Sequence, residues 1–152
     1  MIRRSSHAVW ECAYHVVWAT KRRRRALRET SQRAYCARLL RRVAEVYDMY
    51  IEALEVDVDH VHVCVAIPPQ QSVGLAVRRM KSMSARYMFK KFPELRRTMW
   101  TGGLWSPSYF VRAVGDRVTA DVVRNYIESH DEKAALGGQA ELFPRGKAKR
   151  RT

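Results

Sequence analysis

The sequence predicts an α+β fold in which two helices cover one face of an antiparallel four-stranded sheet. Short segments that alternate or are rich in β-branched and aromatic residues predict the strands, and longer segments with apolar residues at helical spacing predict the helices. The strands are expected over 8–19, 50–58, 60–67 and 108–114, and the helices over 29–49 and 73–91. This β-α-β-β-α-β order is the ferredoxin-like plan, which leaves the second face of the sheet open.

Local signals place the ends of these elements. Thr30 or Ser31 can cap the first helix and Ser72 the second, and Pro93 is expected to end the second helix. Residues after Pro93 predict a loop that leads into the last strand. A third helix is then expected over 117–132.

Length and composition favour a single domain. The chain has 152 residues, of which 47% are hydrophobic, so it can bury a proper core. We expect one domain over 1–136 and a basic, mobile tail over 137–152. No apolar run is long enough for a membrane span and no signal segment is present, which favours a cytoplasmic protein without membrane contact. The three cysteines form no CxxC motif, so neither a zinc ribbon nor a disulfide framework is indicated.

The charge of the chain indicates a polyanionic partner. Lys and Arg number 29 against 15 Asp and Glu, a formal net charge of +14. Such an excess opposes compaction by self-repulsion and is typical of proteins that bind nucleic acid, with an anionic membrane surface as the second candidate. Basic proteins that only bind ribosomes share this charge, so it does not separate an enzyme from a binder.

Two histidines on one predicted strand are the central chemical clue. His60 and His62 are separated by one residue, so on a strand they point to the same face. Two neighbouring imidazoles can share one metal ion, although many such pairs are structural. This pair directly follows Asp57 and Asp59, which strengthens the case for a site. The apolar residues expected to face the helices instead are Val61, Val63, Val65 and Ile67.

The last predicted helix offers partners for this pair. Tyr126 and His130 are four residues apart and so lie on one helical face. His130 could supply a third metal ligand and Tyr126 a phenol beside the same ion; alternatively, Tyr126 is a partly buried tyrosine and His130 an exposed histidine. A phenol attacking a phosphodiester would form a phosphotyrosine, which conserves the energy of the broken linkage for later rejoining. A metal ion there would stabilise the charge on phosphorus.

Basic and aromatic residues are the candidates for contacts with DNA. Phosphate contacts are expected mainly from Lys21, Arg22, Arg23, Arg24, Arg78, Arg79, Lys81 and Arg86. Trp18, Trp100 and Trp105 could stack on unpaired bases, but burial in the core is at least as plausible for each. For His15, ordinary packing is favoured over a place near the metal.

The sequence resembles the HUH single-tyrosine transposases of the insertion-sequence-200/605 type. The resemblance covers about residues 8–132 and rests on patches in the expected order. These patches are HVVWATKR at 15–22, DHVHV at 59–63, WSPSYF at 105–110 with VG at 114–115, and VRNYI at 123–127.

The resemblance implies a specific activity. Members act as homodimers on single-stranded DNA at the ends of an insertion sequence, recognise subterminal hairpins and require Mg²⁺ or a similar ion. Carried over, His60 and His62 would be metal ligands and Tyr126 the nucleophile that holds the 5′ phosphate. The family usually has Gln as a third ligand where this chain has His130, and imidazole there could shift the preference towards Mn²⁺.

Three other functions remain open. A domesticated relative, such as a transposase associated with repetitive palindromes, or a replication-initiator nuclease would use similar chemistry. A non-enzymatic RNA-binding ferredoxin-like module would need stacking aromatics on its central strands, whereas His60, His62 and Cys64 are expected on this open face. A metal-only hydrolase is less favoured, because the chain is short for the barrels that usually carry such histidine pairs.

Overall fold

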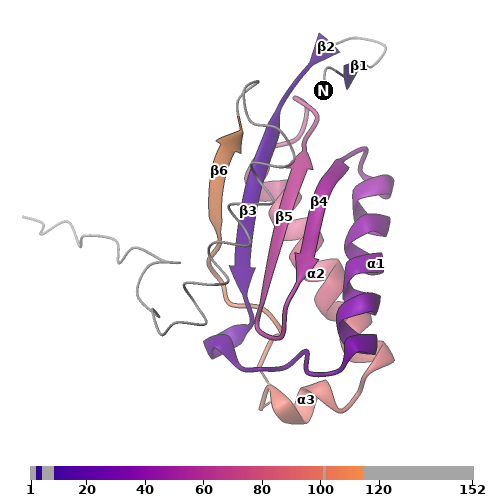
Figure 1. The fold of residues 1–152 in the computed structure, drawn as a ribbon, viewed down its shortest axis with the longest axis vertical. Helices are drawn as coiled ribbons and strands as arrows, with labels where there is room; N and C mark the ends of the chain where they lie inside the picture. Colours follow the sequence, from indigo (N-terminus) through magenta and orange to yellow (C-terminus); the bar gives the residue numbers. More distant parts are fainter. Residues whose placement is uncertain (1–2, 5–8, 101, 115–152) are drawn as a thin grey trace, which may run out of the picture.

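The computed structural model describes residues 3–4, 9–100 and 102–114 (Figure 1). Its main sheet has four strands in the order β4-β5-β3-β6, all antiparallel. The strands are β3 (Ala13–Ala19), β4 (Tyr50–Val56), β5 (His60–Ala66) and β6 (Phe110–Val114). With α1 (Thr30–Val46) and α2 (Val73–Lys91), the chain runs β-α-β-β-α-β, which confirms the predicted ferredoxin-like plan.

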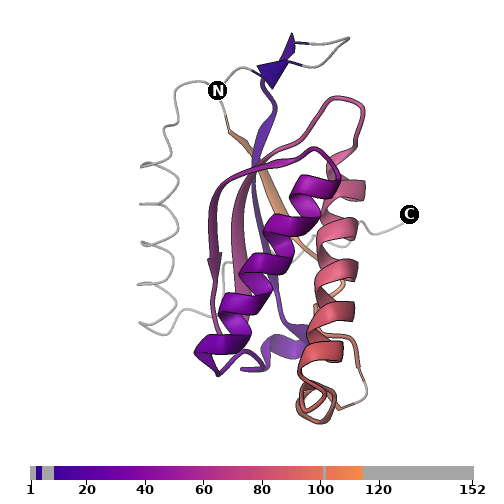
Figure 2. The same cartoon turned by 90° about the vertical axis from the view of Figure 1, so that its right-hand side faces the viewer.

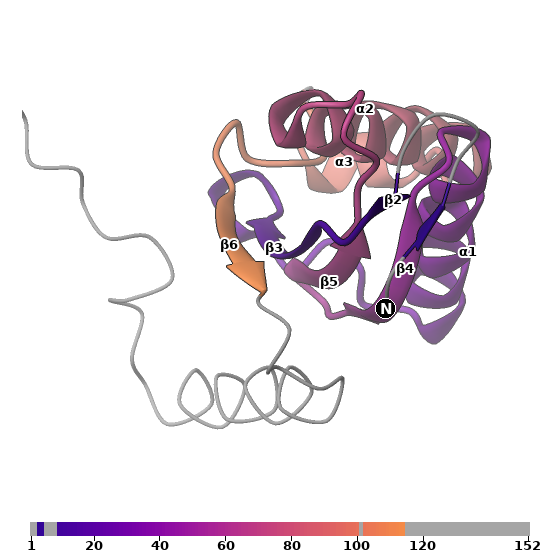
Figure 3. The same ribbon diagram turned by 90° about the horizontal axis from the view of Figure 1, so that it is seen from above.

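Both long helices lie against one face of the sheet (Figures 2 and 3). The strand residues with odd numbers in β5 face them, because successive side chains on a strand alternate between faces. Val61, Val63 and Val65 are fully buried in one apolar cluster with Leu40 of α1 and Met80 of α2. The core therefore fills the space between sheet and helices, and leaves the even-numbered side chains of β5 for the opposite face.

The first predicted strand is interrupted. Residues Val9–Trp10 form β2, which pairs with β1 (Arg3–Arg4) in a separate two-stranded ribbon. The chain leaves this ribbon at 11–12 before β3 begins. The predicted last strand is shorter than expected and starts at Phe110. Two short helical turns were not predicted, η1 (Lys21–Arg23) and α3 (Leu95–Thr98).

Of the two predicted helix N-caps, that of α2 is confirmed and that of α1 is wrong. Ser72 caps α2 as predicted, since its hydroxyl accepts the Leu75 N–H at 3.1 Å, and α2 ends before Pro93. The cap of α1 is Glu29 rather than Thr30 or Ser31. The Gln32 side chain explains this position, because its Oε1 accepts the Glu29 backbone N–H at 3.1 Å and so completes a capping box.

Two predicted segments, the helix over 117–132 and the tail over 137–152, lie outside the described residues. No helix in the described part is long and apolar enough to cross a membrane. The cysteines are all free, with Cys36 and Cys64 buried and Cys12 intermediate.

Candidate active site

The two histidines of β5 lie side by side on the sheet face away from the helices. Their ring centroids are 4.7 Å apart and the rings are tilted by 79°. Both side chains are buried, with His60 4% and His62 1% exposed. The strand alternation that sends the valines into the helical core places both imidazoles together, as the sequence predicted.

His15 of β3 adds a third imidazole to the row. It stacks on His62 with ring centroids 5.8 Å apart and planes 12° from parallel. This contact follows from the sheet register, in which Val17 pairs with His62 and His15 with Cys64. Sequence reasoning favoured ordinary packing for His15, and the signal it lacked was the register between β3 and β5.

Asp59 orients His60. Its Oδ1 lies 2.6 Å from His60 Nδ1, while Asp57 Oδ2 lies 3.7 Å from Nε2. The hydrogen bond with His60 lowers the pKa of Asp59, and the charges of His60, Arg23 and Arg25 add to this effect against an opposing contribution from burial. An ionised Asp59 carries no proton, so Nδ1–H of His60 must donate to it. In the neutral imidazole, Nε2 then keeps its lone pair as a potential metal ligand.

The turn that holds Asp57 and Asp59 is fixed to the end of β3. The Asp57 backbone N–H donates to the His60 carbonyl at 2.8 Å, which closes the turn. The Thr20 N–H donates to the Asp59 carbonyl at 2.8 Å, and the Leu27 N–H to the Val58 carbonyl at 3.0 Å. These bonds use backbone atoms, so they hold the turn without engaging the carboxylates.

The donor set fits part of a metal site. Two imidazoles at this separation can bind one divalent ion, and a carboxylate on the far nitrogen of one ring is a common support for such a ligand. Within residues 3–4, 9–100 and 102–114, no group of three His, Cys, Asp or Glu side chains could hold a metal ion. The predicted third ligand, His130, and the predicted nucleophile, Tyr126, lie outside these residues.

Cys64 is not a competing nucleophile beside the pair. Its thiol lies on the same face of β5, with Sγ 3.9 Å from Glu52 Oε2. Burial, together with the Glu52 carboxylate, raises the pKa of Cys64 to about 11. The group is therefore a protonated, weakly reactive thiol at neutral pH.

The predicted phosphate-contacting residues form two groups. Lys21, Arg22, Arg23 and Arg24 lie at the end of β3, next to the turn that precedes His60. Arg23 reaches Asp59 with an N–O distance of 3.9 Å. The backbones of Arg22 and Arg23 are left-handed, with φ of 56° and 51°, a strained conformation that is common at functional loops.

The second group lies on α2, whose buried side packs on the other face of the sheet. Two of these residues, Lys81 and Arg79, form hydrogen bonds within the protein. Lys81 Nζ donates to the carbonyls of Ser106 and Ser108, and burial lowers its pKa. Arg79 donates to Gln71 Oε1 and lies 4.0 Å above the Tyr47 ring. The structure thus places residues 21–24 beside the turn that precedes the histidine pair, with Arg23 near Asp59, whereas Arg78, Arg79, Lys81 and Arg86 lie on α2.

The three tryptophans considered for stacking differ in exposure. Trp18 and Trp105 are buried and pack edge to face, with ring centroids 6.0 Å apart. Trp100 is 70% exposed. Only Trp100 of these three presents most of its indole to solvent.

Comparison with known proteins places the chain in a family. The family described as "Transposase IS200 like" matches residues 8–130, a range that includes both Tyr126 and His130. The ISDra2 transposase TnpA of Deinococcus radiodurans is 34% identical over 126 residues, which are 82% of this chain and 88% of that protein. The transposase for insertion sequence element IS200 of Salmonella typhimurium is 29% identical over 137 residues, 90% of this chain and 88% of that protein.

Solved structures agree with the fold. A candidate transposase from Deinococcus radiodurans R1 superposes with a TM-score of 0.69 at 33% identity, covering 86% of this chain and 96% of that one. A REP-associated tyrosine transposase bound to a REP hairpin superposes with a TM-score of 0.54 at 16% identity, covering 90% of this chain and 75% of that one, and shares the fold alone. From its sequence match and its fold together, the chain belongs to the IS200-like transposase family.

Proposed function

We propose that this chain cleaves and rejoins single-stranded DNA at insertion-sequence ends through Tyr126. The observation that carries the proposal is the pair of imidazoles of His60 and His62 on the sheet face opposite the helices. Their ring centroids are 4.7 Å apart. The family match supports it, because the matched range extends through Tyr126 and ends at His130.

In the proposed reaction, the Tyr126 hydroxyl attacks the scissile phosphorus and loses its proton to solvent. A bond forms between the phenolic oxygen and phosphorus, while the bond from phosphorus to the 3′ oxygen breaks and that oxygen takes up a proton. The products are a 5′-phosphotyrosine and a free 3′ hydroxyl. Attack by another 3′ hydroxyl reverses the step and joins new strands.

His60, His62 and His130 are the proposed ligands of a divalent ion, Mg²⁺ or Mn²⁺. When bound, this ion would neutralise charge on the scissile phosphate. Asp59 keeps Nδ1 of His60 protonated and the ring in place, and three nitrogen ligands would favour Mn²⁺ more than an oxygen-rich set does. The relatives support insertion-sequence ends as the substrate, and the hairpin-bound structure suggests hairpin DNA by analogy of fold.

We also propose a homodimer that works in the cytoplasm, with Tyr126 acting beside the histidine pair of either its own or the partner subunit. The related alternative is a domesticated transposase associated with repetitive palindromes or a replication-initiator nuclease. Palindromes near both ends of the gene would favour the mobile element over these alternatives.

The test is covalent capture of DNA. The protein is incubated with labelled single strands from the DNA flanking its gene, with Mg²⁺ or Mn²⁺, and denatured before electrophoresis. We expect an adduct that disappears in Tyr126→Phe and in His62→Ala but persists in Tyr109→Phe, a matched change at an exposed tyrosine. An adduct that survives in Tyr126→Phe would overturn the assignment.

A further inference from the structure

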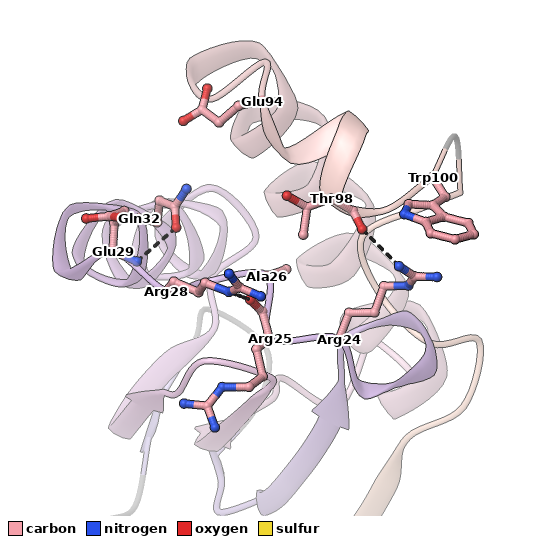
Figure 4. Close-up of a pocket in the computed structure, with 9 residues that line it drawn as sticks. All are labelled: Arg24, Arg25, Ala26, Arg28, Glu29, Gln32, Glu94, Thr98 and Trp100. Carbon is pink, nitrogen blue, oxygen red and sulfur yellow. Dashed lines mark hydrogen bonds between the residues drawn. The ribbon is translucent and has the colours of Figure 1, made fainter.

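A cleft of about 550 Å³ separates residues 24–32 from residues 94–100, at the end of the sheet where β5 begins. Figure 4 shows Glu94, Thr98 and Trp100 along one wall and Arg28 along the other, with Arg24 next to Trp100. The lining of the cleft includes Arg24 and Arg28, the acidic residues Glu29 and Glu94, and Thr98 and Trp100.

Trp100 is held out of the core at an energetic cost. A large aromatic that is 70% exposed forgoes burial, which for a side chain of this size is a substantial loss. Its backbone has φ of 52°, a left-handed conformation that is unfavourable for a bulky residue. The preceding Met99 and the nearby Leu95 are buried, so the segment is anchored while the indole is directed outward. Backbone strain of this kind in a bulky residue is concentrated at ligand-binding and active sites.

Arg24 fixes the indole from one side. Its guanidinium carbon lies 4.5 Å from the centroid of the Trp100 ring, and its Nη1 donates to the Thr98 carbonyl at 3.3 Å. The arginine is thereby bonded to the same short segment that carries the tryptophan. An aromatic ring that is already positioned loses little freedom when a planar ligand stacks on it.

Arg28 supplies positive charge on the opposite wall, whereas Figure 4 shows the Arg25 guanidinium pointing away from Trp100. The Arg28 Nε donates to the Arg25 carbonyl at 3.0 Å, which directs its guanidinium along the cleft. Planar guanidinium groups bind phosphate through paired N–H donors. One wall thus offers a stacking surface and the other offers a phosphate ligand.

The segment that lines one side of the cleft contacts the turn that precedes His60. Leu27, which directly precedes Arg28, donates its N–H to the Val58 carbonyl at 3.0 Å, and Arg23 approaches Asp59 at 3.9 Å. This segment therefore packs directly against the turn that leads into His60.

We propose that this cleft is a nucleotide-binding subsite, in which an unpaired base of single-stranded DNA stacks on Trp100 and the adjacent phosphate binds Arg28. The choice of DNA rests on the proposed function. Binding at this subsite needs neither Tyr126 nor a metal ion, so the two proposals can fail separately.

The test measures binding without cleavage. Fluorescence anisotropy of a short labelled oligo(dT) is followed with the full chain in EDTA. Trp100→Ala is expected to weaken binding by roughly 5- to 150-fold, the range seen when a stacking aromatic is removed, while Trp100→Phe keeps most of the affinity. Arg28→Ala is expected to weaken binding and to flatten its salt dependence.

Two matched variants and an abasic strand make the test specific. Arg41→Ala and Tyr87→Ala, at exposed positions of α1 and α2, are expected to bind as the wild type does. On an abasic strand the penalty of Trp100→Ala should vanish, because no base remains to stack, and a merely structural role for Trp100 would not produce this difference. Circular dichroism and thermal melting check that each variant is folded.

Several results would overturn the subsite: no binding of oligo(dT) by the wild type, unchanged affinity in Trp100→Ala, an equal loss on abasic DNA, or tighter binding of oligo(U) than of oligo(dT). If covalent capture succeeds while Trp100→Ala binds normally, the subsite fails and the transposase chemistry stands. If no covalent adduct forms but Trp100→Ala weakens binding only when a base is present, the subsite stands and the transposase chemistry fails.

Discussion

Asp59 is the single residue on which the geometry of the histidine pair most directly depends. It is bonded to Nδ1 of His60 at 2.6 Å, whereas the turn around it is held by backbone bonds to Thr20 and Leu27. Removing the carboxylate therefore frees the imidazole without removing the bonds that define the turn. Supporting carboxylates of this kind commonly change metal affinity by about 10- to 100-fold.

We expect Asp59→Ala to raise the Mn²⁺ concentration needed for half-maximal adduct formation by roughly 10- to 100-fold, with Asp59→Asn intermediate. Saturating Mn²⁺ should restore most of the adduct, because the proposed ligands themselves remain. Glu45→Ala, at a surface carboxylate of α1 paired with Arg42, is the matched control and should leave the Mn²⁺ midpoint unchanged. An unshifted midpoint in Asp59→Ala would show that this hydrogen bond does not position His60 for metal binding.

Among the elements, the segment between α2 and β6 is attached to α2 by a buried hydrogen bond. Trp105 Nε1 donates to Ser84 Oγ at 2.9 Å, and both side chains are buried. Trp105 also forms an isolated bridge with Thr20, so this bond links α2 to the end of β3.

We expect Ser84→Ala to lower the free energy of unfolding by about 1–3 kcal/mol, because it leaves the buried indole N–H without its acceptor. Ser82→Ala makes the same chemical change at an exposed position of α2 and should stay within about 0.5 kcal/mol of the wild type. Urea unfolding followed by circular dichroism measures both. Equal stability of the two variants would mean that water or another group satisfies the indole.

Periodicity predicted the sheet, both long helices and the shared face of His60 and His62, because each of these depends on which residues are apolar within a short window. The Glu29 cap was missed because Gln32 reaches back to the backbone, and the exposed Glu29 alone looks like a surface residue. The place of His15 depends on the register of β3 with β5, which joins residues far apart in the sequence. The break at 11–12 depends on the short pairing of β2 with β1, which the alternation of residues 8–19 does not reveal. Trp100 could not be separated from Trp18 and Trp105 by sequence, because exposure is set by the fold.

For the molecule as a whole, the buried thiol of Cys36 couples folding to alkaline pH. It lies fully within the core between α1 and the sheet, and burial raises its pKa from an ordinary value of 9.0 to about 12. The unfolded chain therefore releases this proton at a lower pH than the folded protein does. The contribution of the neutral thiol to stability is complete below about pH 9 and is lost progressively as the pH rises towards 12.

Comparison with Cys36→Ala isolates this contribution, because all other titrating groups are common to both proteins. Between about pH 7 and about pH 10 we expect the wild type to lose about 1.4 kcal/mol more of its unfolding free energy than the variant loses. Cys12→Ala, at a partly exposed cysteine, is the matched control and should follow the wild type over the same interval. Urea unfolding at both pH values gives the two differences directly. A Cys36→Ala protein that loses stability in parallel with the wild type would mean that the folded protein ionises this thiol as readily as the unfolded chain does.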